Sequence, residues 1–109
     1  MRKKMPETEY RASRICRVLG NPTAYQIIKL LIAKRSHDIG SGMRPTDIAQ
    51  ELGLSLPLTS TTLRTLRNID LARYDTKGNV KIYWIKEDAL SEICTGLETL
   101  VGRLRHKQW

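Results

Sequence analysis

The sequence predicts a small, mainly α-helical domain of about five helices with a single β-hairpin. Through most of the chain, apolar residues recur three and four positions apart, which is the spacing of a helix face that packs against a core. The spacing breaks near 71–85, where two short runs flank Lys77-Gly78-Asn79, a tight-turn sequence. We therefore expect helices before and after one two-stranded hairpin.

Length and charge limit what the chain can be. Its 109 residues are enough for one domain, 1–109, and 40% of them are hydrophobic. A core of this size is modest, so a partner subunit would add stability. Lys and Arg number 19 against 11 acidic residues, a net charge of +8. This excess favours nucleic acid or an anionic membrane surface as partner. An ordinary protein with surplus Lys and Arg is the alternative.

The cysteines and the apolar runs indicate a compartment. Cys16 and Cys94 are the only cysteines and lie far apart, which excludes a disulfide framework. The first residues are charged and lack the apolar run of a signal peptide. No stretch approaches the roughly 20 apolar residues of a membrane span. We expect a cytoplasmic protein with no membrane partner.

The first two helices follow a loose, basic start at 1–6. The first is expected over 7–19, and Gly20-Asn21-Pro22 ends it. Asn21 suits the cap of the next helix, and Pro22 suits its first turn. That second helix, 22–34, is apolar around most of its circumference, which predicts a buried, central position.

The third helix is expected over 45–52, beginning at Pro45. A polar loop precedes it, with a short edge strand near Met43. Gly53 supplies the positive φ that ends a helix or forms a tight turn. This predicts a sharp turn between the third helix and the fourth.

The fourth helix is expected to begin after Ser55, a favourable N-cap, and to end near Asn68. Helical spacing puts Leu56, Thr59, Leu63 and Leu66 near one line, which should face the core. The remaining surface is small and rich in hydroxyl groups, and no acid occurs between Leu54 and Ile69.

Such a surface suits the major groove of DNA, because a groove-binding helix must be slim and must not present carboxylates to phosphates. Hydroxyl groups bond phosphates or base edges, and Leu58 and Thr methyl groups contact thymine methyl groups. An ordinary solvated face is the alternative. The candidate DNA-contacting residues of this helix are Ser55, Leu56, Pro57, Leu58, Ser60, Thr61, Thr62, Arg64 and Thr65.

The hairpin adds basic residues around its tip. A basic two-stranded wing can lie beside phosphates or reach the minor groove. A plain surface hairpin with solvated lysines is the alternative. Asp75, the one acid here, would have to point away from DNA. The candidate DNA-contacting residues of the wing are Arg73, Lys77, Gly78, Asn79 and Lys81.

The last helix, 88–104, carries apolar residues three and four apart, a spacing that suits a helix–helix seam. A loose, basic end follows at 105–109. Cys16 and Cys94 would form a redox pair if the first and last helices brought their thiols within disulfide distance. Two buried, unreactive cysteines in the seam are the favoured alternative.

Several segments match a known family in order and spacing over about 17–104. They are Leu19-Gly20-Asn21-Pro22-Thr23, Gln26-Ile27-Ile28-Lys29-Leu30-Leu31, Asp47-Ile48-Ala49-Gln50-Glu51-Leu52-Gly53-Leu54-Ser55, and Pro57, Ser60, Leu63, Leu66-Arg67, Leu71, Gly78 and Tyr83. The chain resembles the ArsR-type (arsenical-resistance repressor-like) winged helix-turn-helix transcriptional regulators.

The resemblance implies a homodimer that binds double-stranded DNA at a palindromic operator and represses transcription. It also implies that the first and last helices, 7–19 and 88–104, form the dimer interface. The candidate interface residues are Ile15, Leu19, Leu90, Ile93, Cys94, Leu97, Leu100, Val101 and Leu104.

Departures from the family pattern affect single positions. Ala24 stands where the family usually has Arg. Asp70 replaces the usual Gly before the hairpin, and we expect it to adopt the same left-handed conformation. Arg67 matches a family arginine, but helical spacing puts it on the inner flank, where we interpret it as part of a scaffold ion pair.

The family's metal sites are not reproduced. Arg44 and Thr46 occupy the positions of the Cys-x-Cys site, and neither supplies a thiolate. The last helix does not match the family's carboxylate and histidine site. No nucleophile elbow or phosphate-binding loop occurs either. The sequence therefore predicts no metal, no cofactor and no enzymatic activity. A non-sequence-specific architectural DNA-binding protein and a protein-interaction module using the helical seam are the alternative functions.

Overall fold

The computed structural model describes residues 3–34, 42–85 and 88–106. It confirms a mainly helical fold with one antiparallel hairpin. The expected loose ends fall partly outside the described residues, at 1–2 and 107–109. The elements in chain order are α1 (Glu7–Leu19), α2 (Pro22–Ala33), α3 (Pro45–Leu52), α4 (Leu56–Asn68), β1 (Arg73–Lys77), β2 (Val80–Trp84) and α5 (Asp88–His106).

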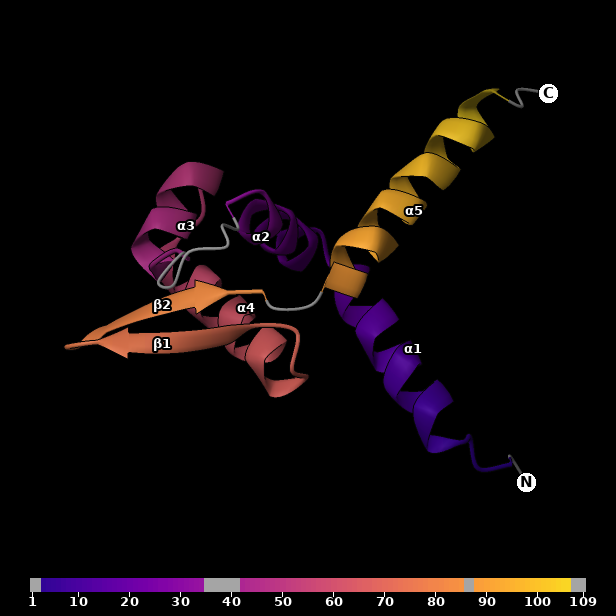
Figure 1. Ribbon diagram of the computed structural model, residues 1–109, viewed down its shortest axis with the longest axis horizontal. Coiled ribbons are helices and arrows are strands. Elements are labelled where there is room, and N and C mark those ends of the chain that lie inside the picture. The colour runs from indigo at the N-terminus through magenta and orange to yellow at the C-terminus, as the bar shows by residue number, and fades with distance from the viewer. Residues whose placement is uncertain (1–2, 35–41, 86–87, 107–109) are drawn as a thin grey trace.

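The chain forms a body with two projecting arms. Helices α2, α3 and α4 and the hairpin make the body, while α1 and α5 diverge from one end of it (Figure 1). The termini lie at the far ends of these arms. Helix α5 stays helical to His106, beyond the expected end at Leu104. None of the helices in the described part of the chain is long and apolar enough to cross a membrane.

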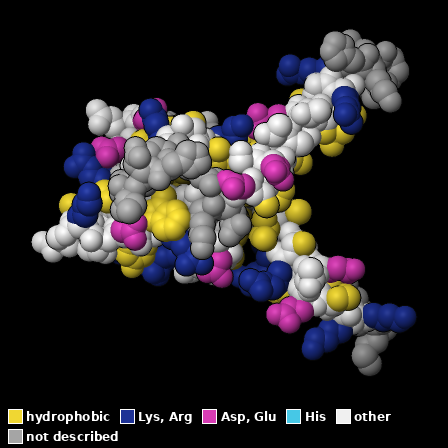
Figure 2. Space-filling view, viewed as in Figure 1, with side chains coloured by type: hydrophobic (Ala, Val, Ile, Leu, Met, Phe, Trp, Pro, Cys, Tyr) yellow, Lys and Arg dark blue, Asp and Glu magenta, His cyan; other side chains and the backbone are white. Residues whose placement is uncertain are grey.

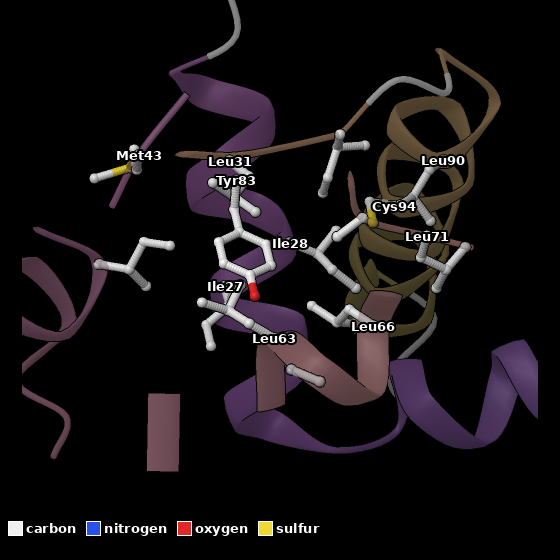
Figure 3. Packing of buried hydrophobic residues seen from close by; sticks show 14 residues of the cluster. Ile27, Ile28, Leu31, Met43, Leu63, Leu66, Leu71, Tyr83, Leu90 and Cys94 are labelled. Atoms are coloured by element: carbon white, nitrogen blue, oxygen red, sulfur yellow. The ribbon is translucent and has the colours of Figure 1, made fainter. Parts of the chain in front are cut away.

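The core surrounds α2, as its uniformly apolar sequence predicted. Ile27 and Ile28 are completely buried, and α2 contacts α1, α3, α4, α5 and β2. Leu63 and Leu66 from α4 pack below it, and Cys94 of α5 approaches it from the side (Figure 3). The central helix therefore contacts every other helix of the chain.

The helix ends are set by residues that the sequence identified. The Asn21 side chain accepts a hydrogen bond from the Ala24 backbone N–H at 3.0 Å. Ser55 Oγ accepts one from the Leu58 N–H at 3.3 Å. Gly53 ends α3 with φ 68°, and Asp70 adopts the predicted left-handed conformation with φ 63°. These features confirm the helix, turn and helix order of α3 and α4.

The segment before α3 joins the hairpin at one point. Met43 and Tyr83 exchange backbone hydrogen bonds of 2.9 and 2.8 Å, which is the predicted edge strand reduced to a single bridge. A side chain at Gly42 would place its Cβ 2.6 Å from the Tyr83 carbonyl oxygen. Glycine is therefore required here by the close approach of two backbones.

A polar link ties α5 to α2. The Tyr25 hydroxyl donates to the Glu98 carboxylate, and Lys29 Nζ lies 2.9 Å from the same group. The hydrogen bond from Tyr25 and the one from Lys29 hold the pKa of Glu98 below its ordinary value. The bond to Glu98, followed by burial, raises the pKa of Tyr25. The link joins α5 to the body one turn beyond the buried Cys94.

One prediction compares two leucines of α4. Leu63→Ala should lower the free energy of unfolding by about 2–5 kcal/mol, since Leu63 is fully buried and truncation leaves a cavity. Leu58→Ala, on the exposed side, should stay within about 0.5 kcal/mol of the original chain. Urea denaturation at equal protein concentration measures both. Equal losses of stability in the two variants would contradict the inward position of Leu63.

A second prediction concerns Glu98. Because its pKa is lower in the folded state than the ordinary value of 4.5, the link stabilises the fold above about pH 4.5. That contribution is lost as the pH falls through the folded-state pKa. Glu98→Gln should therefore lower the thermal midpoint more at pH 7 than at pH 3. Glu92→Gln, on the same helix, is the control, and the same pH dependence in both variants would exclude the link as its cause.

Candidate nucleic-acid interface

The predicted DNA-contacting residues of α4 all lie on its surface. Ser60 and Thr62 are half-buried and the others are exposed, while the buried stripe consists of Thr59, Leu63 and Leu66. The expectation that Leu56 faces the core is wrong, because 45% of it is exposed. As the first residue of α4 it precedes the buried stripe, so it joins the outer surface.

Most threonine hydroxyls of α4 are already used within the helix. Thr62 Oγ1 donates to the Leu58 carbonyl at 2.8 Å, and Thr65 Oγ1 donates to the Thr61 carbonyl at 3.2 Å. Such bonds to the preceding turn leave a threonine with acceptor capacity and a methyl group to present outward. Within the described residues, Ser60 and Thr61 have no such bond. The surface is therefore more apolar than a count of hydroxyl groups suggests.

The register of the hairpin divides the basic residues of the wing between two faces. Thr76 pairs with Lys81 and Tyr74 with Tyr83, so Lys81 shares a face with both tyrosines. Arg73 and Lys77 alternate onto the opposite face. Asp75 lies there as well, on the face opposite the one that carries Lys81 and the two tyrosines. Gly78, with φ 62°, and Asn79 form the exposed tip.

Two cations meet at one tyrosine between α4 and the wing. The Tyr74 ring centroid lies 5.2 Å from Arg67 Cζ and 4.9 Å from Lys81 Nζ. Arg67 Nη1 also donates to the Tyr74 hydroxyl at 3.3 Å, and the Tyr83 ring lies 5.3 Å away. We call Arg67, Tyr74, Lys81 and Tyr83 the Tyr74 cluster. Burial raises the pKa of Tyr83, while the nearby Arg67 charge opposes that shift.

The role expected of Arg67 is corrected by this cluster. Its side chain is exposed and rests on an aromatic ring, and none of the ion pairs in the described part of the chain includes it. The ring attracts cations electrostatically and leaves their charge uncompensated. Sequence reasoning missed the cluster, although the alternation of strand residues about the Gly78 turn already puts Lys81 opposite Thr76 and beside Tyr74.

An ion pair between Arg44 and Asp47 lies at the N-terminus of α3. Arg44 Nε and Nη2 each donate to the Asp47 carboxylate at 2.9 Å. These bonds hold the pKa of Asp47 below its ordinary value. Among the residues with described positions, no three His, Cys, Asp or Glu side chains gather as a metal site. At this position the side chains present make an Arg–Asp pair.

The predicted dimer residues separate into two groups. Leu90 and Cys94 are only 2% and 1% exposed within the single chain, so they belong to its core and offer no area to a partner. Ile15 and Leu19 are half-buried. Hydrophobic side chains line the notch between the arms (Figure 2). The exposed members of the predicted set are Ile93, Leu97, Leu100, Val101 and Leu104.

The two cysteines differ in their surroundings. Cys94 is buried in the core, whereas Cys16 is exposed on α1. Within the single chain, only Cys94 is buried as the helical seam predicted. Both thiols are free in the single chain.

Comparisons with known proteins place the fold. No protein-family model matches the chain, and no curated protein matches it in sequence. Several solved structures do match. One is the homodimeric winged helix-turn-helix DNA-binding domain of Mb0332 from Mycobacterium bovis, a possible ArsR-family regulator (18% identity, 100% of this chain and 98% of the other, TM-score 0.75).

Two further structures are similar over most of their length. NolR from Sinorhizobium fredii shares 22% identity over 94% of this chain and 98% of its own, with a TM-score of 0.72. The antimony-specific transcriptional repressor AntR shares 20% identity over 97% and 91%, with a TM-score of 0.72. Sequence identities this low establish a shared fold alone. The chain therefore has the winged helix-turn-helix fold of the ArsR-type regulators, as the sequence resemblance implied.

Proposed function

We propose that the protein is a homodimeric, sequence-specific DNA-binding regulator that represses transcription. The observation that carries the proposal is the exposed, acid-free face of α4 with the uncompensated cations of the Tyr74 cluster beside it. In this arrangement α4 enters the major groove and the wing lies along the backbone. The fold shared with Mb0332 and with the repressor AntR supports this proposal.

The contacts divide between phosphates and bases. Arg67 and Lys81 are held by the ring of Tyr74, so they are oriented before DNA arrives and lose less side-chain freedom on binding. Uncompensated cations of this kind position a protein on the backbone and carry its salt dependence. Thr61 and Ser60 keep hydroxyl groups for base edges or phosphates. The side of the wing with Arg73 and Lys77 contributes less, because Asp75 lies among those residues.

A second copy of the chain would cover the apolar faces of the arms. Five large hydrophobic residues of α5, between Ile93 and Leu104, are 42% to 53% exposed, and Tyr10 on α1 is 53% exposed. Contiguous apolar exposure of this kind marks an interaction surface. A two-fold axis through it would present two copies of α4 to half-sites about one DNA turn apart, as in a palindromic operator.

The proposal includes no metal switch at α3. Where the ArsR family places two cysteines, Arg44 forms a two-bond ion pair with Asp47, and Thr46 lies between them. The Asp47 carboxylate there accepts two hydrogen bonds from the Arg44 guanidinium, and their charges offset each other. Regulation by metal at this position would need a different set of ligands from the one present.

The decisive experiment is selection of bound duplexes from a random pool, followed by sedimentation with the selected duplex. We expect a palindrome and a homodimer that shifts on DNA. Thr61→Glu combined with Thr62→Glu should abolish binding and leave the dimer intact, because two carboxylates would then face the phosphates. Equal affinity for all sequences would favour an architectural protein. A dimer that ignores DNA would favour a protein-interaction module.

Arg67 provides a separate prediction. Arg67→Ala should weaken binding about tenfold at low salt, because a charge-assisted bond to a phosphate is removed. The slope of log affinity against log salt should become shallower by about 0.9 for each phosphate that is no longer neutralised. Arg103→Ala, on the α5 arm, removes the same charge away from the Tyr74 cluster and should change the slope little. Identical slopes for the two variants would remove Arg67 from the DNA-binding residues.

A further inference from the structure

The first turn of α4 exposes two large aliphatic side chains. Leu56 and Leu58, on either side of Pro57, are each 45% exposed. Outside residues 3–19 and α5, the described part of the chain exposes only one other large hydrophobic residue, Val80 at the wing tip. Packing of the single chain does not explain the two leucines. They lie at the start of the helix that the proposed function puts into the major groove.

The beginning of α4 lacks the side chains that read guanine, adenine and cytosine. Guanine is read in the major groove by Arg or Lys, adenine by Asn or Gln, and cytosine by a carboxylate. None of these residue types occurs from Leu54 to Leu63. The hydroxyl proton of Thr62 is committed to the Leu58 carbonyl. Arg64, the first residue able to read guanine, comes about two turns after Leu56.

Charge favours DNA as the occupant of this apolar turn. No acidic residue occurs between Glu51 and Asp70, so nothing on α4 repels phosphates. Arg64 on the same helix and the Tyr74 cluster beside it provide positive charge. The thymine methyl is the apolar group that base edges display in the major groove. An aliphatic turn within a basic surface is complementary to such methyl groups.

We propose that the first turn of α4 reads thymine methyl groups, with Leu56 and Leu58 as the specificity-determining residues. Each operator half-site then has A·T pairs beneath this turn. The inference rests on the DNA-binding function proposed above and assigns thymine-methyl recognition to the two exposed leucines of this turn. Thr61, which projects from the next turn, contacts the neighbouring base or phosphate through its hydroxyl and methyl groups.

The test replaces single thymines of the selected duplex by deoxyuridine, which removes the 5-methyl group and keeps the base pair. Affinity should fall about fourfold for each contacted methyl, at one or two positions in each half-site. The original chain is compared with the Leu56→Ala plus Leu58→Ala variant, in which deoxyuridine should have no effect at those positions. Val80→Ala, another exposed aliphatic residue shortened in the same interface, should keep the full deoxyuridine effect.

The outcomes separate the two proposals. Sequence-specific binding without any deoxyuridine effect overturns methyl reading and leaves the regulator intact. Absence of sequence-specific binding overturns both. If neither the leucine variants nor deoxyuridine change the affinity for the duplex, methyl reading is also overturned. The first turn of α4 is then a surface that binds an apolar protein partner. Since deoxyuridine leaves the protein unaltered, misfolding of a variant cannot imitate the expected result.

Discussion

Burial of α2 is the constraint on which the rest of the structure depends. Its side chains are apolar around most of the helix, so water has to be excluded from nearly every direction. Five elements contact it, and Ile27 and Ile28 are inaccessible to solvent as a result. Helices α3 and α4, strand β2 and the starts of both arms all pack against this one helix.

The sequence predicts the elements well because their signals are local. The side chains of Asn21 and Ser55 bond the nearest free N–H groups, and Gly53 and Asp70 each need only a backbone conformation that their own type tolerates. Helical spacing also identifies the buried residues of α4 from Thr59 onward. Helical spacing fails at Leu56, which is 45% exposed. The spacing of apolar residues along one helix does not show how far the elements that cover it extend.

The parts of the site that were not predicted depend on contacts distant in sequence. Arg67 looked like a partner for an acid, but its neighbour is Tyr74, which only the fold brings beside it. Leu90 and Cys94 share the apolar stripe of α5 with Leu97 and Leu100. The first pair is buried against the body and the second pair is exposed, although Glu98, between Leu97 and Leu100 in the sequence, contacts α2. Helical spacing identifies the apolar stripe of α5. It does not show which part of the stripe is buried in the single chain and which part stays exposed.

The joint at Glu98 has a mechanical consequence. Tyr25 and Lys29 hold its carboxylate, so the polar link joins the α5 arm to the body one turn beyond the buried Cys94. The molecule extends 50 Å along its longest axis, so a rotation between the arm and the body would move distant atoms most. At roughly 30 Å, the length of a 20-residue helix, a rotation of about 10° displaces an atom by roughly 5 Å, close to one helical turn. If two chains were joined through their arms, a small change in the angle between arm and body would be magnified at the distant tips of both bodies.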